Sequence, residues 1–293
     1  MTTTTRPIGW LWLLRFWGVL GCLFVSALGS TATAQQQTPA ADNSAQDQVA
    51  AAFLSLALRP DHAPTSLAWL EQNWDEGMVP MALEAVRFTQ EASIRLGLME
   101  LVYRKTSRHH GDDLQVWQQW WWNQGSSAHE SYIDFKRILY SFIDPKFRAY
   151  FERPGTRSIR LDEVVWGGVR QDGIPPLRNP QMTDADQATY LEDDNVVFGI
   201  SVNGDHRAYP KRILAWHEMF VDTVGGASVA GVYCTLCGTV ILYFTTVGDT
   251  VHQMGTSGFL YRSNKLMYDA ATSSLWSTMR GAPVMGKLVG QDI

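Results

Sequence analysis

Two cysteines in the C-terminal third of the chain are the residues best suited to chemistry. Cys234 and Cys237 lie in the segment GVYCTLCGTVILYF, with strand-like apolar residues on both sides. A Cys-x-x-Cys-Gly turn between strands resembles the knuckles that hold zinc or iron, since two thiolates can converge there on one ion. The same pair fits a structural disulfide that closes the turn, or a redox-active dithiol. The motif by itself leaves these three alternatives open.

A metal ion would need a further ligand, and His217 is the best candidate. It lies near the end of a predicted helix that opens after Pro210. Two thiolates and an imidazole suit catalytic zinc with an open fourth position, and the same soft ligands suit copper. Glu218 and Asp222 are spaced i, i+4 on a neighbouring face of that helix. We expect them around the metal ligands, with Glu218 as a base or an additional ligand.

Other polar residues of this part are weaker candidates. Asp172 precedes Gly173 and is most simply a turn-former, although it is also a second candidate for a catalytic carboxylate beside Glu218. Arg207 and Tyr209 stand before the predicted helix, where they can contact a small anion, but a salt bridge explains Arg207 equally well. Four further candidates for ligand contact fall in a predicted solvent-facing strand and turn: Arg262, Asn264, Asp269 and Trp276. Two histidines in polar, turn-like segments are weaker candidates for metal ligands: His206 and His252.

The N-terminus bears on the fate of the cysteines. Residues 1–34 combine two arginines, a continuous apolar segment at 16–28 and the small-x-small pattern Ala32-Thr33-Ala34. This order predicts a cleaved signal peptide and an exported protein, periplasmic or extracellular. We expect contact with a membrane only through an uncleaved signal or a lipid anchor at Cys22. Cleavage removes Cys22 and leaves a single cysteine pair in an oxidising compartment.

Composition limits the class of protein. The 293 residues are 45% hydrophobic, which suits one or two domains with a real core. The formal net charge is −5 and no basic run occurs, which argues against nucleic acid as a partner. Residues 35–48 are polar and low in complexity, and they predict a disordered linker.

From residue 49 to residue 151 the pattern is helical. Pro64 and Pro80 stand where first-turn prolines begin new helices. Trp117, Trp120 and Trp121 are spaced i, i+3 and i+4, which predicts one buried face. Short helices in series are typical of a repeat-like helical region, and such a region can bind a protein partner.

From residue 158 to residue 293 the pattern changes to short strand-like runs with frequent turns. NVVFGISV, SVAGVY and TVILYFTT read as strands, and one helix is predicted between the first two. The chain is therefore predicted to be α+β: an all-helical N-terminal region, then a mostly antiparallel α+β domain that carries the Cys-x-x-Cys knuckle.

Four blocks of this second part carry a resemblance to a known family. DEVVWGGVRQDGIPPLRNP, NGDHRAYPKRILAWHEMFVDTVGG, VYCTLCGT and SGFLYRSNKLMYDAATSSLW resemble, in order and spacing, the bacterial and archaeal domain of unknown function 3179 family. The resemblance covers residues 158–293 and centres on the Trp-His-Glu and Tyr-Cys-x-Leu-Cys-Gly-Thr blocks. It implies that His217, Glu218, Cys234 and Cys237 belong to one module, and it names no reaction.

This sequence departs from the family pattern at two positions. Thr235 replaces the usual proline, which loosens the predicted turn, and Val221 replaces an asparagine before Asp222, which weakens the helix as a site. Family members continue beyond the equivalent of Ile293, so the resemblance also implies a truncated chain.

Three function classes follow for an exported protein: a zinc- or copper-binding protein, a thiol–disulfide redox protein, and a non-catalytic binding module with a Cys234–Cys237 disulfide.

Overall fold

The structure is a computed structural model that describes residues 45–152, 155–235 and 238–291. The predicted signal peptide and most of the predicted linker lie outside these residues, as does Cys237. No helix within the described ranges is long and apolar enough to cross a membrane.

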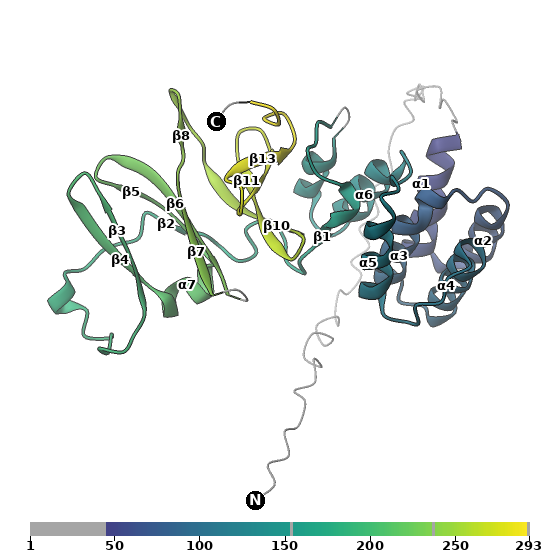
Figure 1. Cartoon of the computed structure of the whole chain (residues 1–293), viewed down its shortest axis with the longest axis horizontal. Helices are drawn as coiled ribbons and strands as arrows, with labels where there is room; N and C mark the ends of the chain where they lie inside the picture. Colours follow the sequence, from purple (N-terminus) through teal and green to yellow (C-terminus); the bar gives the residue numbers. More distant parts are fainter. Residues whose placement is uncertain (1–44, 153–154, 236–237, 292–293) are drawn as a thin grey trace, which may run out of the picture. The chain divides into compact units, whose positions relative to one another are not determined.

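Six α-helices form the first half of the described chain (Figure 1). They are α1 (Ala45–Leu58), α2 (Ala63–Gln72), α3 (Val79–Phe88), α4 (Ala92–Thr106), α5 (Leu114–Gln124) and α6 (Tyr132–Ser141). Pro64 and Pro80 lie in the first turns of α2 and α3, as predicted, because proline has no backbone N–H and is tolerated where that group has no helical partner. Helix α1 overlaps the last four residues of the predicted linker, 45–48.

The predicted buried tryptophan face of α5 is confirmed for two of its three residues. Trp117 and Trp121 are fully buried and Trp120 packs against the same core from a partly buried position. The ring centroids of Trp117 and Trp120 lie 5.6 Å apart in an edge-to-face arrangement, which aromatic pairs favour. These rings therefore serve as core.

The second half of the described chain is rich in strands (Figure 1). The strands are β1 (Val164–Trp166), β2 (Leu177–Arg178), β3 (Val197–Val202), β4 (Asp205–Pro210), β5 (Met219–Val224), β6 (Ala227–Cys234), β7 (Thr239–Phe244), β8 (Thr246–Val247), β9 (Thr250–Val251), β10 (Met254–Tyr261), β11 (Asn264–Asp269), β12 (Leu275–Ser277) and β13 (Ala282–Met285). One α-helix, α7 (Lys211–His217), lies among these strands. Short 3₁₀ helices occur in both halves of the described chain: η1 (Pro60–His62), η2 (Glu76–Met78), η3 (Pro145–Phe151), η4 (Leu161–Glu163) and η5 (Ala185–Gln187).

The strands form two main sheets and two hairpins. A five-stranded sheet has the order β1-β10-β11-β12-β13, a four-stranded sheet has the order β2-β5-β6-β7, and β3-β4 and β8-β9 pair separately. All pairings are antiparallel except that of β2 with β5. The predicted class, α+β with N-terminal helices and mostly antiparallel sheets, is confirmed.

The four-stranded sheet is covered on both faces. Its residues Val221 and Ala230 pack with Met267 and Trp276 of the five-stranded sheet. On the opposite face, Phe220 and its neighbours pack with residues of β4 and α7. Strand β5 is therefore almost continuously apolar, because a strand covered on both sides loses the usual alternation.

The helices and the five-stranded sheet share one hydrophobic core. Phe259 of β10 lies edge-to-face with Tyr140 of α6 at a centroid distance of 4.9 Å, and Leu266, Leu275 and Val284 belong to the same buried cluster. The predicted boundary near residues 151–158 therefore falls inside a continuous core.

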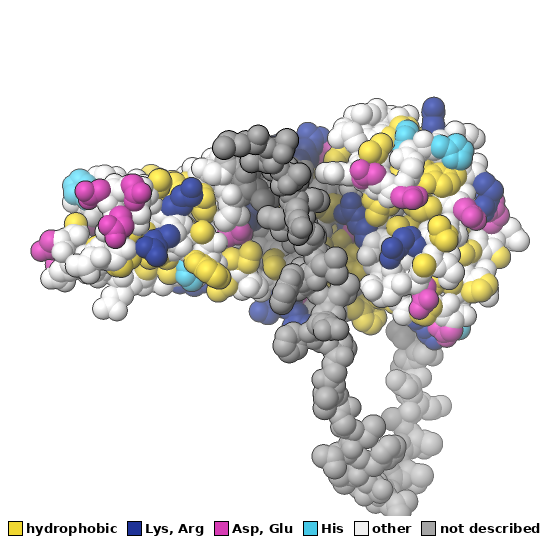
Figure 2. Space-filling model, turned by 90° about the horizontal axis from the view of Figure 1, so that it is seen from below, with side chains coloured by type: hydrophobic (Ala, Val, Ile, Leu, Met, Phe, Trp, Pro, Cys, Tyr) yellow, Lys and Arg dark blue, Asp and Glu magenta, His cyan; other side chains and the backbone are white. Residues whose placement is uncertain are grey.

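Charged side chains are mixed on the surface. On the face shown in Figure 2, the acidic and basic groups drawn in colour are interspersed and form no continuous basic patch. That distribution agrees with the composition argument against a nucleic-acid partner, which stays a prediction.

Candidate functional site

The helix that carries His217 is shorter than the sequence predicts. Helix α7 ends at His217 because Glu218 takes the left-handed conformation, with φ of 54°, and its N–H still donates to the carbonyl of Leu214. The chain then enters β5, so the predicted placement of Glu218 and Asp222 together on one helix is wrong. The apolar segment MFVDTV prefers the sheet, where it pairs with β6.

Asp222 is buried in a polar network of its own. Its Oδ2 accepts from the hydroxyl of Tyr209 at 2.7 Å and from Arg207 at 2.8 Å, and Oδ1 accepts from the N–H of Thr223. Arg207 also forms a two-pronged ion pair with Asp205. Hydrogen bonding to Asp205 and then to Asp222 raises the pKa of Arg207, and burial raises that of Tyr209. These side chains join β4 to β5, so the predicted salt bridge of Arg207 is confirmed and its contact with a small anion finds no support here.

Strands flank the predicted Cys-x-x-Cys knuckle on both sides, while residues 236 and 237 of the knuckle lie outside the described residues. Strand β6 ends at Cys234, β7 begins at Thr239, and these two residues are paired in the register. The N–H of Gly238 donates to the carbonyl of Cys234 at 2.8 Å, and Gly238 has a φ of 65°, which suits glycine. Cys234 is disulfide-bonded, and the other two cysteines of the chain lie outside the described residues.

The Trp-His-Glu segment and the cysteine turn meet in space. The N–H of Tyr233 donates to the carbonyl of Glu218 at 2.9 Å, and the hydroxyl of Thr235 donates to Oε1 of Glu218 at 3.0 Å. The other oxygen of Glu218 is paired with the ammonium group of Lys265 on β11. Burial lowers the pKa of Lys265, against the opposing effect of Glu218. A partly buried ion pair therefore lies one residue from Cys234.

His217 is oriented by the backbone. Its Nδ1 lies 2.8 Å from the carbonyl oxygen of Pro175. Since a carbonyl only accepts, Nδ1 carries the proton and Nε2 keeps a free lone pair when the ring is neutral. Within the described ranges, no group of three or more His, Cys, Asp or Glu side chains is arranged to hold a metal ion. One predicted ligand, Cys237, is not among those residues.

Asp172 is a turn-former and also a cross-link. It takes a positive φ of 51°, and its carboxylate accepts from the N–H of Thr256 at 3.0 Å and from the hydroxyl of Tyr268 at 2.6 Å. Burial and then this contact raise the pKa of Tyr268 to about 12. Both oxygens are engaged, so the geometry gives Asp172 a structural role and no direct support as a catalytic acid.

Arg262 and Asn264 belong to the β10–β11 hairpin, where a strand and turn were predicted. The predicted solvent-facing character is wrong for the rest of the strand, because β11 is buried from Leu266 to Asp269 against the apolar cores. Arg262 donates to Glu163 at 2.7 Å, and the side chain of Asn264 donates to the carbonyl of Arg262 at 3.0 Å. The guanidinium therefore ties the hairpin to η4 and is engaged in that ion pair.

Sequence reasoning missed Lys265 altogether. It falls in the last of the four blocks quoted above, but nothing in its spacing indicates that it reaches Glu218 across 47 positions. It also misjudged His252, which is buried beside Asp269 and Trp276 instead of lying in a polar turn. Contacts of this range have no local signal in a single sequence.

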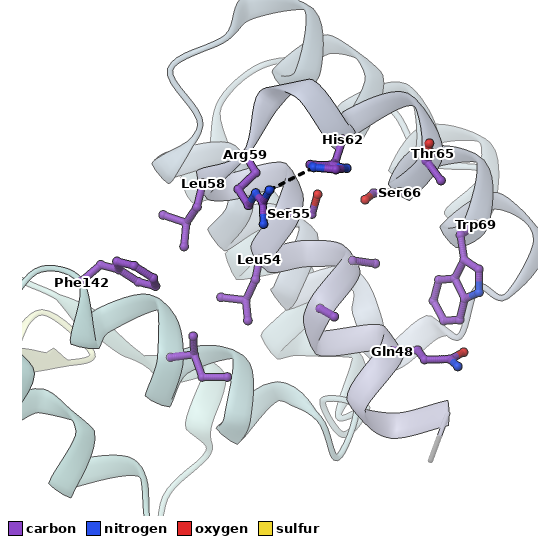
Figure 3. A pocket seen from close by; sticks show the side chains of 13 residues that line it. Gln48, Leu54, Ser55, Leu58, Arg59, His62, Thr65, Ser66, Trp69 and Phe142 are labelled. Carbon is purple, nitrogen blue, oxygen red and sulfur yellow. Dashed lines mark hydrogen bonds between the residues drawn. The ribbon is translucent and has the colours of Figure 1, made fainter. Parts of the chain in front are cut away.

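The helical region carries a separate apolar groove of about 810 Å³ along α1 and α2. Figure 3 shows Leu58 and Phe142 at one end and Trp69 and Gln48 at the other, with Arg59 hydrogen-bonded to His62 on the rim. Phe142 is 70% exposed. The prediction that this region binds a protein partner stays a prediction, and the groove is the concave surface where it can be tested.

Comparison with known proteins gives one match. Residues 171–293 match the model of the family described as "Protein of unknown function (DUF3179)". No curated protein and no solved structure gives a significant match to the chain. The match begins at Gln171 and contains every candidate residue of the cysteine turn.

Proposed function

Residues 171–293 belong to the DUF3179 family of proteins of unknown function. We propose that this domain is an exported thiol–disulfide redox module. Its reactive pair is Cys234 and Cys237. The observation that carries the proposal is the disulfide-bonded state of Cys234 at the end of β6, a strand that is also paired with β7 through the backbone. Export, inferred from residues 1–34, is part of the proposal.

The hairpin is closed by its own backbone. Six residue pairs align β6 with β7, from Val229 opposite Phe244 to Cys234 opposite Thr239. A cross-link between positions 234 and 237 closes a loop of four residues, for which the loss of chain entropy in the unfolded state is worth only about 2 kcal/mol. A disulfide with so small a structural benefit favours a chemical role.

The ion pair beside the turn supplies suitable electrostatics. Lys265 pairs with Glu218, which accepts from Thr235 beside Cys234. In the proposed exchange, the ammonium group would stabilise a thiolate of the pair, and the carboxylate would accept a proton from a thiol. Exchange begins when a thiolate of a partner protein attacks one sulfur of the pair and forms a mixed disulfide. A second thiol of the partner then attacks the partner's sulfur in the mixed disulfide and releases the remaining cysteine of the pair. The partner thereby gains a disulfide, and Cys234 and Cys237 become thiols. Two electrons and two protons are transferred.

We expect the cysteine pair to have a reduction potential above about −250 mV, in the range of redox-active pairs. Titration against glutathione buffers, with alkylation of free thiols read by mass spectrometry, measures it. Lys265→Met should lower the potential by about 30 mV or more, because the reduced form loses a stabilising cation. The exposed Lys287 provides the matched control, Lys287→Met. A potential below about −300 mV that does not respond to Lys265→Met would instead indicate the structural disulfide of a non-catalytic binding module.

A second candidate function is supported by the orientation of His217. Metal-binding histidines usually donate one ring N–H to a carbonyl or carboxylate, which fixes the other nitrogen as the ligand atom. The contact of His217 with Pro175 has this form. Once the cysteine pair is reduced, two thiolates and Nε2 would suit zinc or copper, and Glu218 would lie beside them as a base or a further ligand.

We expect the reduced protein to retain about one zinc or copper per chain if this candidate is right. Elemental analysis of protein purified without a metal-affinity tag measures the content. Cys234→Ser should abolish retention, and His217→Ala should weaken it, while the circular dichroism of the helices stays unchanged. His206→Ala is the matched control, since this exposed histidine lies on β4. Full occupancy in Cys234→Ser would exclude the cysteine as a ligand.

A further inference from the structure

A cavity of about 160 Å³ lies between the two main sheets, and its lining includes neither Cys234 nor the Glu218–Lys265 ion pair. Its walls come from both sheets: Ala230, Tyr243 and Phe244 from β6 and β7, and Met254, Met267 and Trp276 from β10, β11 and β12. His252, between β9 and β10, completes one side. The space is close to that of a cavity known to hold a benzene molecule, about 150 Å³.

Two donors in these walls have no partner. The hydroxyl of Tyr243 and Nε1 of Trp276 are buried, and neither has a hydrogen-bond partner among the described residues. A buried donor left unsatisfied costs about 1–3 kcal/mol, so a ligand that accepts from both groups would recover that free energy. Burial raises the pKa of Tyr243 to about 12, which keeps its hydroxyl protonated as a donor.

A third polar group is held in place by Asp269. The Nδ1 of His252 lies 3.3 Å from Oδ1 of Asp269, which is 1% exposed. The other oxygen of Asp269 accepts from the N–H and the hydroxyl of Thr272. Asp269 therefore orients the imidazole and has its own negative charge engaged by donors.

The chemistry of the walls defines the ligand. Trp276 is a donor only, Tyr243 has a free donor, and His252 is held by Asp269 through Nδ1. A carboxylate offers two acceptor oxygens, one for each of the two unpartnered donors. The rest of the lining is apolar and polarisable, with Met254 and Met267 suited to a short chain or a ring.

We propose that this cavity is a binding site for a small organic carboxylate of ring or short-chain size. The carboxylate oxygens accept from Tyr243 and Trp276, and the apolar body packs against Met254 and Met267. The site uses none of the residues of the proposed redox centre, so its experimental test does not depend on that proposal.

Isothermal titration calorimetry of the mature chain with benzoate and butyrate tests the site. Benzyl alcohol and butanol are the neutral controls of similar size, and we expect them to bind at least about tenfold more weakly, because an alcohol offers one acceptor oxygen in place of two. Tyr243→Phe and Trp276→Phe should each raise the Kd for the carboxylate about fivefold or more. Ala230→Leu should abolish binding, because the larger side chain fills the space.

Stability measurements separate a binding role from a structural one. Tyr243→Phe removes only an unsatisfied hydroxyl, so its thermal midpoint should equal or exceed that of the wild type while its affinity falls. Trp120→Phe, in the helical region, is the matched control and should change neither the affinity for benzoate nor that for butyrate. The proposal is wrong if neither carboxylate gives a saturable signal, if the alcohols bind equally well, or if binding survives in Ala230→Leu.

Discussion

Replacing Lys136 with alanine is expected to lower the free energy of unfolding by about 3–5 kcal/mol, the largest effect of any substitution considered. The ammonium group is fully buried and donates to Oε1 of Glu84 and to the carbonyl of Val164, each at 2.8 Å. Tyr140 donates to the same oxygen of Glu84. Without the lysine, Glu84 becomes a buried carboxylate that has lost its cation. Urea unfolding followed by circular dichroism measures the change.

The size of the effect comes from position and burial. Lys136 joins α3 and α6 to β1, at the core that the helices share with the five-stranded sheet. Burial lowers the pKa of Lys136, although the charge of Glu84 opposes that shift. Replacing both partners, as in Lys136→Met with Glu84→Gln, should cost less than Lys136→Met alone, because no unpaired charge is left in the core.

A second lysine provides the matched control. Lys105 pairs with Glu71 at 3.1 Å, but both side chains are partly exposed to water. Lys105→Ala should therefore change the free energy of unfolding by less than about 1 kcal/mol. An equal effect of the two alanine substitutions would refute the assignment of Lys136 to a buried ion pair.

Replacing Asp222 with alanine is expected to lower the free energy of unfolding by about 3 kcal/mol. The carboxylate is 4% exposed and accepts from Arg207, Tyr209 and the N–H of Thr223. Arg207 keeps Asp205 as a partner in the variant, but the hydroxyl of Tyr209 loses its acceptor in a buried site. Denaturant unfolding of the purified variant gives the value.

Two milder substitutions show how that energy is divided. Asp222→Asn keeps an acceptor for Tyr209 and should cost less than Asp222→Ala, whereas Tyr209→Phe removes one hydrogen bond and should cost about 1 kcal/mol. Asp222→Ala with wild-type stability would mean that the network joining β4 to β5 contributes little to the fold.

The local features of the fold were predictable because they depend on neighbouring residues. The strands on either side of Cys234 follow from β-branched residues interrupted by Gly238, and the first turns of α2 and α3 follow from Pro64 and Pro80. The family resemblance of the C-terminal part was also readable, and it is confirmed over residues 171–293.

The end of α7 was predicted wrongly for a definable reason. The segment after His217 can be read with a helical spacing, since Glu218 and Asp222 are four residues apart. Pairing of β5 with β6 overrides that reading, because it satisfies the backbone of a segment whose two faces are both covered by apolar side chains.

By itself, the sequence determined the class of fold, the helical first half and strand-rich second half, and the strands on either side of Cys234. Only the tertiary structure decided which polar groups meet: Glu218 with Lys265, Asp222 with Arg207, and His252 with Asp269. The physical reason is the range of the interactions. Turn chemistry and hydrophobic period act between close neighbours, whereas these ion pairs and the cavity between the sheets depend on how distant strands pack.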